Sequence, residues 1–281
     1  MNRMIDVTTT DPITLEVVRN KVDGIANEMQ STLLRSSFST VVKEGLDASA
    51  SLFTPNGETL AQAIAIPIHL ATLIPIVETI ARTFPMDEMK PGDLYIMNDP
   101  YLGGTHLPDI AIVMPVFFDE RPIAFSAAMT HHQDVGGMSP GSVPPNATEI
   151  YQEGIRIPPL KLREGNEFNH TLVEMLKLNV RVPQVFMGDI GAQISACTVG
   201  ARRVAELAGR YYQADLHPET RIGDANFFDH THRGITTGQT GIIGSGCVIY
   251  PCTLGGLSEN VHKLHPSKGN YAQIIPDVGI F

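Results

Sequence analysis

The sequence predicts a mixed α+β domain followed by a short parallel β-helix. Three observations lead to this prediction: apolar residues at helical spacing near the N-terminus, apolar strands separated by turns in the middle, and a six-residue repeat after Tyr212. We therefore expect two domains, over residues 1–212 and 213–281. The β-helix would stack short strands and point one aliphatic residue inward at each turn.

Composition excludes several classes of protein. The 281 residues are 43% hydrophobic, enough for a core, and carry a formal net charge of −10. An acidic chain without a run of Lys or Arg repels phosphate backbones, so nucleic acid is not an expected partner. Pro67 and His69 interrupt the most apolar stretch, so no membrane span is expected. The N-terminus lacks the apolar segment of a signal peptide, and the three cysteines form no disulfide framework, which together predict a soluble, cytoplasmic protein.

The first half of the α+β domain begins with an amphipathic helix. Asp11 can cap it, Pro12 suits its first position, and the pattern ends at Ser36–Ser39. A turn at residues 55–57 then separates a strand from its predicted return strand. The expected elements here are the strands Ala48–Phe53 and Thr59–Ile66 and a second helix, Leu70–Phe84.

The second half is built around an apolar hairpin. Asp119–Pro122 form the turn between its two strands. A polar loop precedes the hairpin, and a long loop at Met138–Thr148, with three prolines, follows it. The expected elements are the strands Leu94–Met97, Ile110–Phe118 and Ile123–Met129, and helices over Phe168–Tyr212 that break at Pro183.

Histidine and aspartate residues flank this hairpin at one end. His106 and Asp109 precede its first strand, and His131 and His132 follow its second. The start of one antiparallel strand lies beside the end of its partner, so these side chains should converge. Imidazole and carboxylate together favour Mn, Fe or Zn, and Asp134 could orient a ligand imidazole. The alternative is that these histidines are ordinary hydrogen-bonded residues without a metal.

Long motifs around these residues resemble those of the hydantoinase B/oxoprolinase family, which includes N-methylhydantoinase and acetone carboxylase subunits. They are GDLYIMNDPYLGGTHLPDIAIVMPVF, THHQDVGGMSPGS and EGIRIPPLKL. The resemblance runs from about Asp11 to Tyr212, and full members are longer, so we expect a partial domain.

This resemblance implies an activity, a partner and a site. The activity would be ATP-dependent hydrolysis of a cyclic amide of the hydantoin or oxoproline type, or a related carboxylation. A hydantoinase A-type partner subunit would bind the ATP. His106, Asp109 and His131 match the ligands of a Mn-type metal in the carboxylase branch of the family. The residues expected around the same pocket are Asn98, Asp99, His132 and Asp134.

The segment after Tyr212 resembles the C-terminal part of serine O-acetyltransferase. The residues are ADLHPETRIGD, FFDH, GITTGQTGIIGSGCVIYPCTLGG and LHP. The resemblance implies a left-handed β-helix, acetyl-CoA as acetyl donor, L-serine as acceptor and a homo-oligomer. His230 matches the general base, Asp215 its orienting carboxylate, and Asp229 and His265 the serine-binding pair.

Three functions therefore remain open from the sequence. The first is a hydantoinase B-like component of a hydrolase, and the second is a serine acetyltransferase. The third is an inactive fusion or remnant, because each resemblance covers only part of the length of a full family member. The histidines of the second segment could equally form a solvated surface.

Overall fold

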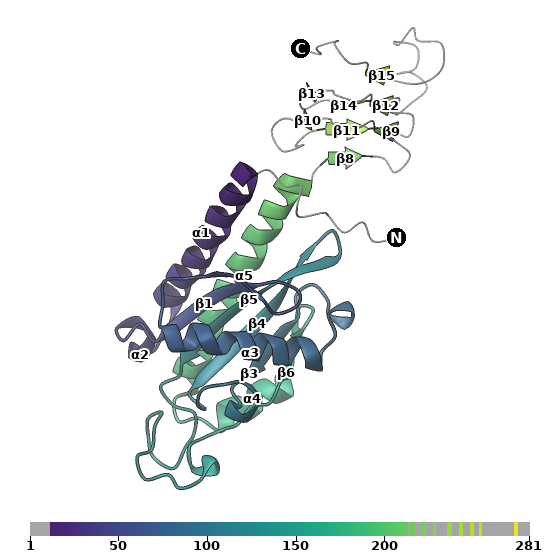
Figure 1. Ribbon diagram of the computed structural model, residues 1–281. Helices are drawn as coiled ribbons and strands as arrows, with labels where there is room; N and C mark the ends of the chain where they lie inside the picture. Colours follow the sequence, from purple (N-terminus) through teal and green to yellow (C-terminus); the bar gives the residue numbers. More distant parts are fainter. Residues whose placement is uncertain are drawn as a thin grey trace. The chain divides into compact units, whose positions relative to one another are not determined.

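The protein is described by a computed structural model, which covers residues 12–212 and the backbone of eight short strands beyond them (Figure 1). The chain divides into two compact units, Met1–Ala205 and Glu206–Phe281. In the part of the chain that the structure describes, no helix is long and apolar enough to cross a membrane.

The first unit is built on one seven-stranded sheet in the order β2-β1-β5-β4-β3-β6-β7, and every neighbouring pair is antiparallel. The long β4–β5 hairpin lies at its centre. The strands are β1 (Ala48–Phe53), β2 (Thr59–Gln62), β3 (Leu94–Met97), β4 (Asp109–Phe118), β5 (Arg121–His131), β6 (Leu160–Glu164) and β7 (Glu167–Phe168).

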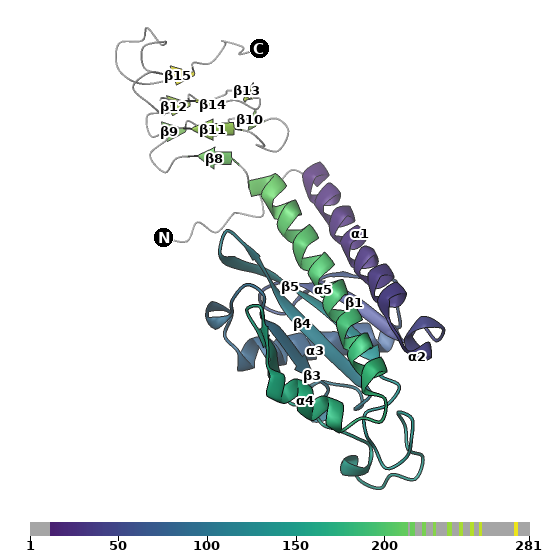
Figure 2. The same cartoon turned by 180° about the vertical axis from the view of Figure 1, so that it is seen from behind.

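Helices cover both faces of this sheet. Helix α3 (Pro67–Thr83) lies on one face, and α1 (Pro12–Ser36), α4 (His170–Leu178) and α5 (Pro183–Tyr212) lie on the other (Figures 1 and 2). A short helix, α2 (Thr40–Lys43), joins α1 to β1. The described part of the chain also contains single turns of 3-10 helix, which are η2 (Met86–Glu88), η3 (Pro100–Leu102) and η4 (Ile150–Gln152).

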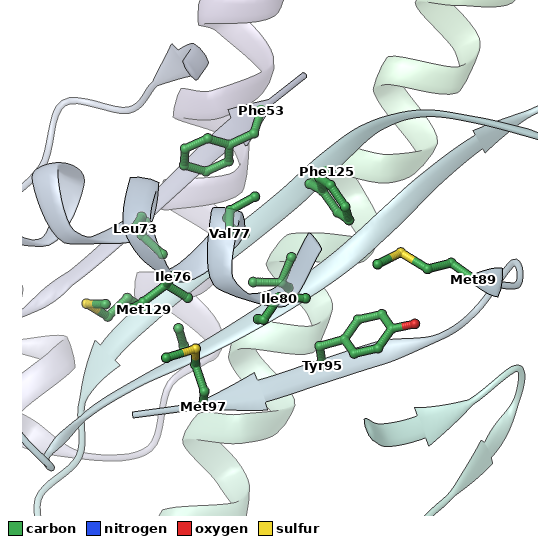
Figure 3. Close-up of a cluster of buried hydrophobic side chains, with 13 residues drawn as sticks. Phe53, Leu73, Ile76, Val77, Ile80, Met89, Tyr95, Met97, Phe125 and Met129 are labelled. Carbon is green, nitrogen blue, oxygen red and sulfur yellow. The ribbon is translucent and has the colours of Figure 1, made fainter. Parts of the chain in front are cut away.

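The main apolar core lies between α3 and the sheet (Figure 3). Alternate residues of a strand point to the same face, so β4 and β5 each contribute every second side chain to this layer. Leu73, Ile76 and Ile80 recur at helical spacing on α3 and are fully buried against them. The strand members of the cluster include Phe53, Tyr95, Met97, Ala111, Val113, Phe125, Ala127 and Met129.

The mixed α+β class and the order of elements in the first unit are confirmed. Three details differ from the sequence prediction: β2 ends at Gln62 rather than Ile66, α3 starts at Pro67, and β6 and β7 were not predicted. Apolar and charged residues alternate in the segment Leu160–Glu164, and this strand is stabilised by pairing with β3. That pairing is long-range, so local sequence did not indicate it.

The second unit contributes short strands that pair in parallel. β8 (Ala214–Leu216), β11 (Ile235–Thr237) and β14 (Thr253–Leu254) form one small sheet. The other two contain β9 (Arg221–Ile222), β12 (Ile242–Ile243) and β15 (Gln273–Ile274), and β10 (Phe227–Phe228) and β13 (Val248–Ile249). The β-helix itself stays a prediction. Only the backbone of Asp215 is described, and Asp229, His230 and His265 lie outside the described residues.

Helix α5 approaches the sheet closely at Gly200. A Cβ atom there would lie 2.4 Å from both the Met29 sulfur of α1 and the Ser126 hydroxyl of β5. Both neighbours are fully buried and cannot move aside easily. Gly191 lies on the same helix but is exposed, and a Cβ atom added there would have no neighbouring atom within 4 Å.

These two glycines give opposite predictions for the same substitution. Gly200→Ala should lower the free energy of unfolding by about 1–3 kcal/mol, because it overpacks a filled interface. Gly191→Ala should raise it by about 0.5–1 kcal/mol, because alanine favours the helix. Urea unfolding followed by circular dichroism measures both values. Equal effects of the two substitutions would contradict the packing described.

Candidate metal centre

Three neighbouring strands bring acidic and imidazole side chains to one end of the sheet. Asp109 at the start of β4 pairs directly with His131 at the end of β5. The ladder continues to the residue before β1, where the Asp47 carbonyl accepts a hydrogen bond from the His131 backbone N–H at 3.0 Å. By two-residue alternation, Asp109 and His131 face the same side as Ala111 and Met129, which is the side of α3.

Two more histidines reach this cluster from outside the sheet. His69 lies in the first turn of α3, and its Nε2 is 3.3 Å from both the Asp47 and the Asp109 carboxylates. His106 lies on the loop before β4, where the Asp109 backbone N–H donates to the His106 carbonyl. The cluster, named here the His/Asp cluster, therefore contains Asp47, His69, His106, Asp109 and His131.

Asp109 is the centre of the cluster. Its Oδ2 lies 2.9 Å from His106 Nδ1 and 3.3 Å from His69 Nε2, and accepts a short hydrogen bond from Thr105 Oγ1. Its Oδ1 lies 3.4 Å from His131 Nδ1 but makes no hydrogen bond among the described residues. Only 1% of the Asp109 side chain is exposed, so the surrounding groups must balance its charge.

The electrostatics agree with this arrangement. Burial would raise the pKa of Asp109, but its contacts with His106, His131 and His69 outweigh burial and hold the pKa well below its usual range. The hydrogen bond to Asp109 raises the pKa of His106, and burial only partly opposes this. Asp109 is therefore a carboxylate, and His106 readily carries a positive charge when no metal is bound.

The cluster opens to solvent on one side. His106 and Asp47 are 39% and 30% exposed, whereas His69 is 3% exposed. The loop Met138–Thr148 contacts the His131 ring, because the Nε2 of His131 lies 2.7 Å from the Ser142 hydroxyl. A ligand could therefore reach the cluster along the His106 edge.

His132 faces the opposite side of the sheet. It is fully buried, its ring packs against Phe186 of α5 with centroids 4.7 Å apart, and its Nε2 lies 3.2 Å from Gln193 Oε1. Burial lowers the pKa of His132 to about 4, so it is neutral at pH 7. Because successive side chains of a strand point to opposite faces of the sheet, the adjacent residues His131 and His132 lie on different faces.

The remaining pocket residues predicted from the sequence have internal partners. Asn98 is buried, and its side chain bonds only backbone groups among the described residues. Asp99 accepts from the Tyr101 N–H and lies 3.6 Å from Arg156 Nε. Within residues 12–212, Asp134 pairs with Arg181 at 2.7 Å, and its expected role in orienting an imidazole stays a prediction. Substrate binding by these four residues, including His132, stays a prediction.

The His/Asp cluster fits a divalent transition metal. Within the described residues, ligand atoms of His106, Asp109 and His131 all lie within 4.8 Å of one another. Asp109 Oδ1 and His69 Nδ1 are buried without hydrogen-bond partners among those residues, which leaves donor atoms available. Imidazole nitrogen with carboxylate oxygen suits Mn, Fe or Zn better than Ca or Mg.

Comparison with known proteins identifies the family. A model of the family described as hydantoinase B/oxoprolinase matches residues 11–220. The chain belongs to the hydantoinase B/oxoprolinase family. The match contains the whole His/Asp cluster and ends before most of the second unit, so the comparison gives no support to the acetyltransferase prediction there.

Named members of this family are similar over the same region. The chain is 39% identical over 203 residues to caprolactamase subunit beta of Pseudomonas jessenii, which covers 72% of this chain and 35% of that protein. It is 36% identical over 204 residues to 5-oxoprolinase of Dictyostelium discoideum, covering 73% of this chain and 16% of that protein. The chain thus spans about a third or less of these relatives.

A solved structure confirms the fold of this family region. The crystal structure of ATP-dependent caprolactamase from Pseudomonas jessenii superposes with a TM-score of 0.67 at 36% identity. The alignment covers 73% of this chain and 35% of that one.

Sequence reasoning missed Asp47 and His69. Asp47 precedes β1 by one residue, and its place beside His131 depends on β1 pairing with β5. His69 carried a usable signal, because a histidine within an otherwise apolar helix needs a buried polar partner.

The pKa of His106 provides a test of the cluster in protein stripped of metal. Asp109→Asn should lower the His106 pKa toward its ordinary value, because the hydrogen bond to the carboxylate raises it. NMR titration of the imidazole signals measures this, with Asp134→Asn as control because Asp134 pairs with Arg181. An unchanged His106 pKa in the Asp109 variant would contradict the geometry.

The same shifts fix the sign of the pH dependence of stability. A raised His106 pKa stabilises the fold fully below the unfolded value of 6.5, and this stabilisation is lost as pH rises through the folded pKa. A lowered Asp109 pKa stabilises the fold above 3.8, and this is lost as pH falls further. The metal-free pair should therefore contribute most between pH 3.8 and 6.5, which urea unfolding at a series of pH values measures.

Proposed function

We propose that residues 1–212 form the hydantoinase B-like component of an ATP-dependent enzyme that hydrolyses a cyclic amide with the help of a divalent metal. The observation that carries this proposal is the convergence of three imidazoles and two carboxylates at one sheet end in a chain of this family. The metal would be held by His106, Asp109 and His131.

The substrate class is inferred from the names of the relatives. Caprolactamase and 5-oxoprolinase are named for caprolactam and 5-oxoproline, which both contain an amide in a ring. The similar solved structure is of an ATP-dependent enzyme, and the similar caprolactamase chain is a subunit named beta. These names support a second subunit, and the sequence resemblance implies that it is of the hydantoinase A type and binds the ATP.

The chain's own residues would prepare the site for this chemistry. A bound divalent metal supplies a Lewis acid that polarises a carbonyl oxygen or lowers the pKa of a water molecule. Asp109 is fixed in position by Thr105, and His131 by Ser142. His69 and Asp47 complete the polar lining, and the exposed edge at His106 admits the substrate.

For the second unit we propose a short parallel β-helix without an assigned reaction. Parallel partners on successive strands, such as Asp215 with Thr236 and Thr236 with Thr253, support stacked coils. The sequence resemblance to serine acetyltransferase is the only argument for acetyl-CoA. An inactive fusion remains the outcome if neither unit shows its expected ligand.

Metal analysis tests the first part of this proposal. The purified chain should contain about one Mn, Fe or Zn per molecule, and His106→Ala or His131→Ala should lower that content by about tenfold or more, because each removes a ligand. His170→Ala is the matched control, because His170 is an exposed histidine at the start of α4. Inductively coupled plasma mass spectrometry measures the content.

Activity requires the partner. Co-expressed with a hydantoinase A-type subunit, the wild-type chain should open a lactam or hydantoin ring with ATP hydrolysis, and His106→Ala should not. Metal-free wild-type protein, or equal metal content in all three variants, would refute the proposed role of the cluster.

Ser142 offers a subtler test of the same site. Its hydroxyl contacts His131 Nε2, so Ser142→Ala should weaken metal binding about tenfold through loss of ring orientation, while the ligands remain. Competition with a chelating dye measures the affinity. Ser195→Ala is the control, because Ser195 bonds only its own helix backbone among the described residues. Equal affinities in the two variants would show that the loop does not hold His131 in solution.

A further inference from the structure

An arginine on the η4–β6 connection lies over two exposed tyrosine rings. The Arg156 Cζ is 5.8 Å from the ring centroids of both Tyr101 and Tyr151, which is within the range of cation–π attraction. The tyrosines are 74% and 76% exposed, so they cover little of the core. Large exposed aromatic residues around a cation are typical of a recognition site rather than of packing.

The guanidinium keeps part of its hydrogen-bonding capacity. Its Nε faces the Asp99 carboxylate at 3.6 Å, and within residues 12–212 its two terminal nitrogens make no hydrogen bond to protein. Asp99 is committed on its other oxygen to the Tyr101 N–H. The two terminal nitrogens are therefore available to a ligand, and a guanidinium fork suits two oxygens of one anion.

The backbone on either side of Arg156 is fixed. The Ile155 N–H donates to the Val135 carbonyl at 2.8 Å, and the Ile157 N–H donates to Asn98 Oδ1 at 2.6 Å. The side chain consequently starts from a rigid point, which reduces the entropy lost when a ligand binds.

A buried amide joins the segment that carries Arg156 to the loop that carries His106. The Asn98 amide donates to the Leu107 carbonyl at 2.6 Å and to the Ile155 carbonyl at 3.0 Å. Leu107 follows His106, and Ile155 precedes Arg156, so one buried amide holds the two loops side by side.

We propose that Arg156, with Tyr101 and Tyr151, is an oxyanion-binding site at the rim of the His/Asp cluster. The inference rests on the proposed function for its two candidate ligands. In the proposed reaction, transfer of the terminal phosphoryl group of ATP to the amide oxygen would release ADP and leave a phosphoryl group on the substrate. Addition of water would then open the ring, release phosphate and produce a carboxylate. The phosphoryl group and the carboxylate both present the paired oxygens that a guanidinium fork binds. Because Asp99 already offsets part of the charge, free anions should bind weakly.

The test uses inorganic phosphate and acetate as probes on the full chain freed of metal. Wild-type protein should bind at least one of them saturably, as measured by calorimetry and by ³¹P or ¹³C NMR line broadening. Arg156→Gln should weaken that binding about tenfold or more, because it removes charge-assisted hydrogen bonds. Arg156→Lys, which keeps the charge but loses the fork, should fall between the two.

Arg163→Gln is the matched control. Arg163 also lies over an aromatic ring, 5.7 Å from the Phe168 centroid, and bonds the Gly92 carbonyl. It pairs with Leu94 at the other end of β3 from Asn98. Its replacement should leave phosphate and acetate affinities unchanged, and the melting temperatures of all variants confirm folding.

The outcomes separate the ligands and the two proposals. Tighter binding of phosphate identifies a phosphoryl subsite, and tighter binding of acetate identifies a carboxylate subsite. Equal affinity in wild type and Arg156→Gln, or no saturable binding of either ion, overturns the inference. A purified wild-type chain that contains no metal but still binds the anion through Arg156 would overturn only the proposed function. The anion titration does not depend on the metal, because it is done without one.

Discussion

The Asp109 carboxylate, almost entirely withdrawn from water, constrains the elements around it. Removing such a charge from solvent costs several kcal/mol unless partners compensate. Its partners come from three places: His69 from α3, His106 from the preceding loop, and His131 from β5. The start of α3, the register of the β4–β5 hairpin and the course of the loop are therefore interdependent. A bound cation would interact with the same carboxylate.

The two faces of the sheet are linked through one pair of adjacent residues. His131 belongs to the cluster on the α3 side, whereas His132 lies against α5. Gln193 of α5 contacts the His132 ring through its Oε1 and donates from its Nε2 to the carbonyls of Ile110 and Ala128, one on each strand of the hairpin. The register that opposes Asp109 to His131 is thus supported by a helix on the far face, whose close approach depends on Gly200.

Local geometry explains which parts of the site could be predicted from sequence. The convergence of His106, Asp109 and His131 follows from antiparallel pairing within a single hairpin, which turn signals reveal. Asp47 and His69 could not be placed this way, because their positions depend on β1 lying beside β5 and on α3 packing across the sheet. The pairing of Asp134 with Arg181 could not be found from local sequence either, because the two residues are 47 positions apart.

Asn98, which the sequence predicts to lie around the pocket, connects backbone segments that are far apart in the sequence. Its carbonyl oxygen accepts from Ile157, and its amide nitrogen donates to Leu107 and Ile155, so both ends of one planar group are used. A carboxylate of the same shape could accept but could not donate, and would place a charge against two carbonyl oxygens. The Asn98 amide therefore joins the His106 loop to the Arg156 segment, and an aspartate at this position would break that link.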